Sequence, residues 1–244
     1  MLDTVFNIII GLISNFIFFA LGAIFHKIWL RTKQVEKNEI WRMLSNDKLV
    51  IALSIRDGTN TTSTPRASIA EVIALTEILP VFKQLNINFK IVDNYSNVLL
   101  QDYNNFLSIG GPNANHLTSV ILKKYNNKLP IKILLSPAGF EIGNKKYETV
   151  YSADNSKIEI DYAAVLVICD KSDEHTIKNN IVIMGCRGYG TQGGVLSISN
   201  KELIKKHKRY KRNKSFVAII KVEIGENGLL HTKVEDFFPL DIFD

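Results

Sequence analysis

Three segments of the sequence together supply glycines, hydroxyl groups and arginines in a way that suits a ligand carrying phosphate. They are RDGTNTTSTPR (residues 56–66), GGPNANHLT (residues 110–118) and GCRGYGTQGG (residues 185–194). Glycines let the backbone approach a ligand closely, and the start of a helix offers free N–H groups to an anion. The residues that we expect to bind the ligand are Arg56, Thr59, Thr61, Thr62, Ser63, Arg66, Gly110, Gly111, Asn113, Asn115, Thr118, Arg187, Gly188, Tyr189, Gly190 and Thr191.

Each of these segments follows a short apolar run that we interpret as a buried strand. The runs cover residues 48–55, 106–111 and 180–185. In open α/β sheets ligands bind beyond the carboxyl ends of the strands, so parallel strands would bring the three loops to one edge of the sheet. Taken singly, each loop has a simpler explanation, because Gly-Gly-Pro often marks a strand-to-helix turn and a Ser/Thr-rich loop is often just solvated.

The remaining apolar runs extend this pattern to an α/β domain. Further strands are expected at residues 87–93, 131–136, 161–170 and 216–224, and helical spacing is found at residues 67–85 and 114–125. Strands separated by helices predict a mostly parallel, Rossmann-like sheet, with an antiparallel excursion at residues 139–156. The sequence contains no P-loop motif, and no G-x-G-x-x-G follows the first strand.

The N-terminal segment has the composition of a transmembrane helix. Residues 5–30 contain no acidic side chain and one basic side chain, Lys27, and the run is long enough to cross a hydrocarbon core of ~30 Å. Basic residues follow the run, which predicts an external N-terminus and a cytoplasmic C-terminal part in a bacterial inner membrane. We therefore expect a transmembrane helix at residues 1–30, a stalk at residues 31–47 and a cytosolic nucleotide-sensing domain at residues 48–244.

Small and polar residues recur along this segment at helical spacing. They are Asn7, Gly11, Ser14, Asn15 and Gly22. Steps of three and four residues place them on one side of a helix, and polar groups in a bilayer need partners. This stripe predicts a homo-oligomer in contact with membrane lipid, and it leaves open whether the helices only associate or also line a pore.

The charge pattern offers a second possible contact surface. The net charge is +6, and much of it comes from KKHKRYKRNK at residues 205–214. This run could meet anionic lipid headgroups, or the phosphates of a nucleotide with Tyr210 stacking on a base, or only solvent. The C-terminal residues 234–244 alternate acids with phenylalanines, which suggests a subunit contact.

Residues for catalysis are sparse. The five histidines are scattered without metal-ligand spacing, and we expect no metal and no cofactor. Cys169 and Cys186 are too few for a disulfide framework. Glu71 and Asp161 are the carboxylates that could act as a nucleophile on a nucleotide or nucleoside. More often such residues cap helices or pair with arginines.

A single transmembrane helix with a polar face, followed by an α/β domain with a nucleotide-like pocket, resembles the membrane effectors of bacterial nucleotide-signalling anti-phage systems of the CBASS, Pycsar or Hailong type. The resemblance is one of architecture over the whole chain, and it rests on no aligned motif. It implies a domain that binds a nucleotide or oligonucleotide second messenger made by a partner nucleotidyltransferase, and that thereby controls an oligomeric pore. The competing expectation is a membrane-tethered enzyme acting on nucleotides or nucleosides.

Overall fold

The structure is a computed structural model, and it describes residue 19 and residues 21–25, 38–45, 48–56, 66–92, 104–135, 138–173, 176–210 and 215–241. The chain divides into two units, Met1–Glu39 and Ile40–Asp244. The elements in chain order are α2 (Glu39–Arg42), β1 (Leu49–Leu53), β2 (Ile55–Arg56), β3 (Arg66–Ala67), α3 (Ile69–Gln84), β4 (Phe89–Val92), β5 (Asn105–Ile109), α4 (His116–Lys124), η2 (Asn126–Lys128), β6 (Ile131–Leu135), β7 (Ala138–Ile142), β8 (Lys145–Glu148), β9 (Val150–Tyr151), β10 (Ile158–Asp173), β11 (Thr176–Gly185), α5 (Gly188–Ser197), α6 (Lys201–Arg209), β12 (Ser215–Gly225) and β13 (Gly228–Leu240).

The main sheet is mixed. Its strand order is β13-β12-β10-β11-β5-β1-β4, and β9 pairs with β10. Strands β4, β1, β5 and β11 run parallel, whereas the β11–β10, β10–β12, β12–β13 and β9–β10 pairs are antiparallel. The fold is therefore α/β with a mostly antiparallel sheet, and the prediction of a mostly parallel, Rossmann-like sheet was wrong.

The lengths of two connections explain this error. Only residues 174 and 175 separate β10 from β11, whereas a parallel pair needs a crossover of about a dozen residues or more. The segment Ala163–Cys169 of β10 is buried on both of its faces. Such a strand is apolar along its whole length whichever way its neighbours run, so its composition did not reveal its direction.

The C-terminal strand β13 was also missed. We expected residues 234–244 to contact another subunit, but β13 pairs with β12 along its length. The ring of Phe237 stacks on Phe216, with 4.9 Å between the ring centroids. Phe237 therefore packs within the domain.

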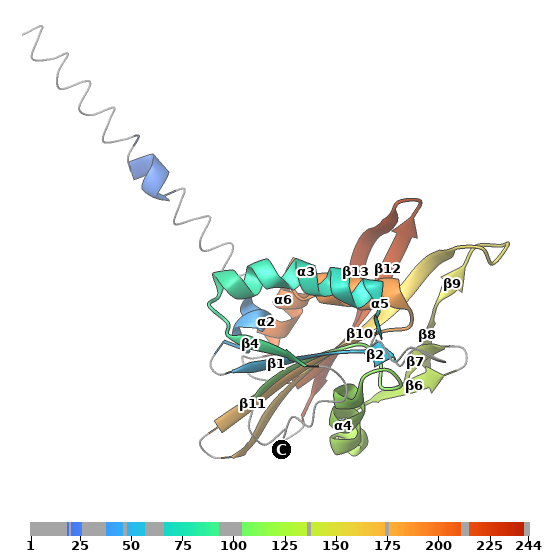
Figure 1. The fold of residues 1–244 in the computed structure, drawn as a ribbon, viewed down its shortest axis with the longest axis horizontal. Coiled ribbons are helices and arrows are strands. Elements are labelled where there is room, and N and C mark those ends of the chain that lie inside the picture. Colours follow the sequence, from blue (N-terminus) through green and yellow to red (C-terminus); the bar gives the residue numbers. More distant parts are fainter. Residues whose placement is uncertain are drawn as a thin grey trace, which may run out of the picture. The chain divides into compact units, whose positions relative to one another are not determined.

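Two apolar layers cover the two faces of the sheet (Figure 1). Helices α2, α3, α5 and α6 pack on one face, against alternate residues such as Leu49, Ile51 and Leu107. Helix α4 and the small sheet of β6, β7 and β8 pack on the other face, against residues such as Val50 and Phe106. The alternation follows the two-residue period of a strand. The small antiparallel sheet confirms the excursion expected at residues 139–156, and it takes in residues 131–135, which we expected in the main sheet.

The predicted transmembrane segment falls largely outside the described residues. Phe19 and residues 21–25 are described, and they are helical. In the described part of the chain, no helix has both the length and the apolar character that crossing a membrane requires. This finding contradicts the predicted transmembrane helix and the predicted single-pass location in a bacterial inner membrane. Crossing a hydrocarbon core takes about 20 apolar helical residues.

Most of the positions that we assigned to helix association also lie outside the described residues. Asn7, Gly11, Ser14 and Asn15 lie outside the described residues. Gly22 is described, and a Cβ atom added there would meet nothing within 4 Å.

The segment that we expected to form a stalk contributes to the core. Ile40, Trp41 and Leu44 are almost fully buried, at 0–1% exposure. The Trp41 ring packs edge-on against Phe82 of α3, with 5.3 Å between the centroids. Helix α2 therefore belongs to the same packed unit as the sheet.

We predict that Trp41→Ala lowers the free energy of unfolding by about 3–5 kcal/mol, because it leaves a cavity against Phe82. Chemical denaturation of the full chain measures this loss. The neighbouring exposed residue provides the control, since Arg42→Ala should change stability by no more than about 0.5 kcal/mol. Equal effects of the two substitutions would contradict the packing of α2 into the core.

Candidate functional site

A pocket of about 330 Å³ lies at the carboxyl ends of the parallel strands β1, β5 and β11. Its walls come from the starts of α3 and α5, the turn after β5, and the small sheet. The lining residues are Ser54, Ser68, Glu71, Gly110, Gly111, Pro112, Asn113, Ala114, Ile133, Leu134, Ala138, Gly139, Phe140, Met184, Gly185, Cys186, Arg187, Gly188 and Thr191. Two of the three predicted loops therefore meet here, as the parallel half of the sheet requires.

The turn after β5 depends on a glycine. Gly110 has φ of +111°, and its N–H donates to the carbonyl of Ile183 on β11 at 2.8 Å. A Cβ atom at Gly110 would lie 1.9 Å from Ser54 Oγ and 2.8 Å from Glu71 Oε1. At Gly111 a Cβ atom would meet nothing within 4 Å. Gly110 thus leaves space for the two polar side chains beside it, while Gly111 faces open space.

Asn115 and Thr118 hold this turn in place from the protein interior. The Asn115 amide donates to the carbonyls of Ala52 and Ile109, both at 3.0 Å, and its oxygen accepts from Thr118 N at 3.2 Å. The Thr118 hydroxyl donates to the carbonyl of Gly110 at 2.8 Å. Both side chains are buried and neither lines the pocket. We had expected them to bind the ligand, but here they position the residues that line the pocket.

Glu71 is a buried carboxylate in the pocket wall. It occupies the third position of α3, with Ser68 as the N-cap. This Ser-x-x-Glu spacing is typical of a capping box, in which both side chains bond within the first turn. The Ser68 side chain makes no cap bond, and Glu71 Oε2 accepts from Ser54 N at 2.8 Å. The carboxylate is therefore directed across to the end of β1.

The glycine-rich segment after β11 forms the start of a helix. Helix α5 begins at Gly188, with Arg187 as its N-cap. A Cβ atom at Gly190 would lie 2.2 Å from the carbonyl oxygen of Tyr162, and one at Gly193 would lie 2.4 Å from Val222 Cγ2. These glycines let α5 lie directly on the sheet. The sequence indicated a loop because four glycines lower helix propensity, and that penalty is overcome here by packing.

Asp161 fixes the start of α5 from inside the protein. Its Oδ2 accepts from Gly190 N at 2.6 Å, and its Oδ1 accepts from the Thr149 hydroxyl at 3.1 Å. Burial raises the pKa of Asp161, and the hydrogen bonds from Gly190, Tyr162, Thr149 and Arg187 partly offset that rise. Asp161 does not line the pocket, so its role is to position the helix rather than to contact a ligand.

Thr191 and Cys186 complete this wall with little reactivity. The Thr191 hydroxyl accepts from Gly185 N at 3.2 Å and donates to the carbonyl of Arg187 at 3.4 Å. Burial, followed by the charge of Asp161, raises the pKa of the Cys186 thiol to about 12. A thiol with so high a pKa is a poor nucleophile at neutral pH.

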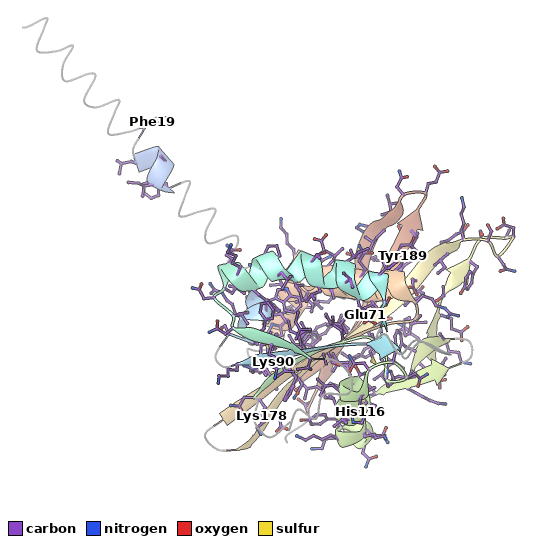
Figure 2. The ribbon with its side chains drawn as sticks, viewed as in Figure 1. Phe19, Glu71, Lys90, His116, Lys178 and Tyr189 are labelled. Carbon is purple, nitrogen blue, oxygen red and sulfur yellow. The ribbon has the colours of Figure 1, made fainter. Side chains whose placement is uncertain are left out.

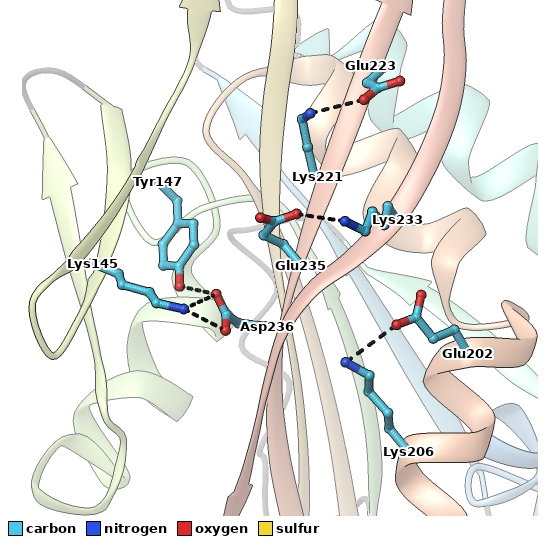
Figure 3. Close-up of polar contacts among 9 residues, drawn as sticks. All are labelled: Lys145, Tyr147, Glu202, Lys206, Lys221, Glu223, Lys233, Glu235 and Asp236. Atoms are coloured by element: carbon cyan, nitrogen blue, oxygen red, sulfur yellow. Dashed lines mark hydrogen bonds and ion pairs between the residues drawn. The ribbon is translucent and has the colours of Figure 1, made fainter.

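The small sheet supplies the apolar wall and is fastened to the edge strand β13. Lys145 Nζ donates to Asp236 at 2.9 Å, and the Tyr147 hydroxyl donates to the same carboxylate at 2.6 Å (Figure 3). Burial opposes ionisation of Asp236, but these two hydrogen bonds, together with the charges of Lys145 and Lys206, outweigh it and hold the pKa of Asp236 below its usual value. Ile133 and Phe140 of this small sheet line the pocket.

Other predicted positions lie away from the pocket. Tyr189 is exposed beside the β12–β13 turn (Figure 2), where its ring would meet a Cβ atom at Gly228 at 4.0 Å. Gly190 is buried and donates to Asp161. Residues 57–65, with Thr59, Thr61, Thr62 and Ser63, lie outside the described residues. Arg56 and Arg66 pair through their backbones in β2 and β3, and Ser54 and Ser68 on either side of these strands line the pocket.

The described part of the basic run, residues 205–210, does not line the pocket either. Most of this part lies in α6, where Lys206 pairs with Glu202 at 3.4 Å. The Tyr210 ring, expected to stack on a base, stacks on Phe237 with 5.4 Å between the centroids. Of the possible interpretations of this run, the described part fits a solvated helix face.

Known proteins give this site no assignment. No protein-family model matches the chain, and no curated protein sequence gives a significant match. Within the described residues, no three His, Cys, Asp or Glu side chains gather where a metal ion could be held.

Sequence analysis missed three contributors to the pocket, namely Ser54, Ser68 and the small sheet. The Ser-x-x-Glu spacing at Ser68 and Glu71 was visible, but it predicts a capping box. No sequence signal indicates that residues 131–148 fold back over the strand ends.

We predict that Gly110→Ala lowers the free energy of unfolding by about 2 kcal/mol or more, because it combines a strained φ with a collision at Ser54. The matched variant Gly111→Ala should stay within about 1 kcal/mol of the wild type. Thermal and chemical denaturation of the two variants test this pair, and equal stability of both would contradict the geometry of the turn.

Proposed function

We propose that the pocket binds a nucleotide or a nucleotide-derived signal. One observation supports this proposal most directly. Arg187 and the starts of α3 and α5 line one pocket at the carboxyl ends of three parallel strands. Helix starts and guanidinium groups are favourable partners of phosphate. A volume of about 330 Å³ lies within the usual range of small-molecule sites, and it suits one mononucleotide unit.

The helix starts differ in a way that supports an anion site. Asn115 caps α4 by accepting from Thr118 N, and Asn200 caps α6 by accepting from Glu202 N. The N-cap side chains of α3 and α5, which are Ser68 and Arg187, make no such bond. No N-cap side chain holds the first N–H groups of α3 or of α5. At α5 the carboxylate of Asp161 already holds Gly190 N, so a ligand phosphate could bond there only to N–H groups that precede Gly190.

The apolar side of the pocket suits a base. Ile133 and Phe140 of the small sheet and Met184 of β11 are apolar residues of the lining. A nucleotide could place its phosphate at the start of α5 and its base against this wall. Pockets of this mixed character, apolar with a few convergent polar groups, are typical of small-molecule sites.

An enzyme acting on nucleotides or nucleosides is the alternative function. Of the two carboxylates considered, Glu71 lines the pocket and Asp161 does not. The described lining contains one carboxylate, no histidine and a thiol of raised pKa. Acid–base catalysis usually needs a second group within reach, so these residues favour binding over turnover.

The wider role stays a prediction. A homo-oligomeric effector in anti-phage defence that responds to the product of a partner nucleotidyltransferase is compatible with a nucleotide site. The resemblance of architecture that suggested this role included a transmembrane helix, which the described residues contradict.

We predict that nucleoside monophosphates raise the unfolding temperature of the full chain, and that Arg187→Ala weakens their binding about 10- to 100-fold, because a charge-assisted hydrogen bond is lost. A thermal-shift screen followed by titration calorimetry measures both effects. Arg209→Ala, an exposed arginine on α6, is the control and should bind as the wild type does. Absence of any shift, or equal binding by the wild type and Arg187→Ala, would sink the proposal.

A further inference from the structure

We propose that Glu71 is a specificity-determining residue that accepts hydrogen bonds from the ribose hydroxyls of the ligand, so that the pocket selects ribonucleotides over deoxyribonucleotides. The inference rests on the proposed nucleotide site and adds the class of sugar to it. The inference depends on the direction of the Glu71 carboxylate, on the hydrogen bonds that it can accept, and on its closeness to Arg187 and the start of α5.

The Glu71 carboxylate has a defined direction. Oε2 is held by Ser54 N at 2.8 Å, and Oε1 lies 2.8 Å from the point where a Cβ atom of Gly110 would be. The side chain is 6% exposed, and it lines the pocket. Figure 2 shows Glu71 near the end of α3 that lies beside α5. The carboxylate is thus fixed between the ends of β1 and β5.

The carboxylate is suited to accept from a donor. Its Oε2 already acts as an acceptor, from Ser54 N. An ionised carboxylate accepts at about four lone-pair positions and donates none. A ligand group placed against Glu71 should therefore be a donor, such as a hydroxyl group.

Because the starts of α3 and α5 are close together, the donor that Glu71 contacts should be a sugar hydroxyl rather than an amino group of the base. A Cβ atom at Gly188 would lie 3.0 Å from the Cβ atom of Ala70, so the residues next to Arg187 and Glu71 are in contact. The group that Glu71 contacts must therefore lie close to the phosphate. In a nucleotide that group is the ribose, whereas the base reaches the apolar wall of Ile133 and Phe140.

Titration calorimetry on the full chain tests this inference. The probes are the nucleoside monophosphate that gives the largest thermal shift and its 2′-deoxy and 3′-deoxy counterparts. For the wild type, we expect removal of a hydroxyl group to weaken binding about tenfold or more, as for a hydrogen bond to a charged group. In Glu71→Gln this preference should fall to about threefold or less, because an amide is a weaker acceptor than a carboxylate.

Glu77→Gln is the matched control, since Glu77 is exposed on the same helix and should keep the wild-type preference. Equal binding of the ribose and deoxyribose forms by the wild type would overturn the inference while leaving the nucleotide site intact. A preference that survives in Glu71→Gln would also overturn it. If no monophosphate binds at all, the proposed function fails and the inference fails with it.

Discussion

The close approach of α5 to the sheet is the constraint on which the pocket depends. Gly190 and Gly193 let this helix lie against the carbonyl of Tyr162 and the side chain of Val222, with no room for a Cβ atom at either position. Asp161 then holds the first turn through Gly190 N. As a result, the start of α5 touches the start of α3, and Arg187 and Glu71 face one cavity.

The two halves of the sheet contribute differently to this arrangement. The parallel strands β1, β5 and β11 end together and supply the turn at Gly110 and the glycines after β11. The antiparallel strands β10 and β12 support α5 from below, and β13 fastens the small sheet through Asp236. The pocket is therefore built where the parallel strands end, and the antiparallel half positions two of its walls.

The sequence predicted the parts of the site that depend on local chemistry. Gly110, Gly111, Asn113, Arg187, Gly188 and Thr191 were expected in a pocket, and they line one. Asn115 and Thr118 were expected to bind the ligand, but they lie behind the lining, where their amide and hydroxyl groups donate to backbone carbonyls. Glycine content alone cannot distinguish a ligand-binding loop from a helix that must lie close to a sheet.

The features that the sequence did not predict have two different causes. The direction of β10 and β11 follows from a connection of two residues, whereas their apolar composition fits either direction. The hydrogen bonds from Lys145 and Tyr147 to Asp236 join segments about 90 residues apart in the sequence. Nothing local in residues 131–148 indicates that they cover strand ends from elsewhere in the chain.

Hydrogen–deuterium exchange of the full chain, with and without the best-binding nucleoside monophosphate, tests the central claim most directly. The account predicts slower exchange in peptides containing Gly111–Ala114 and the first turns of α3 and α5, with α6 unchanged, because a bound phosphate and sugar would shield those amides. Slower exchange confined to α6, or none at the two helix starts despite saturation with nucleotide, would contradict it.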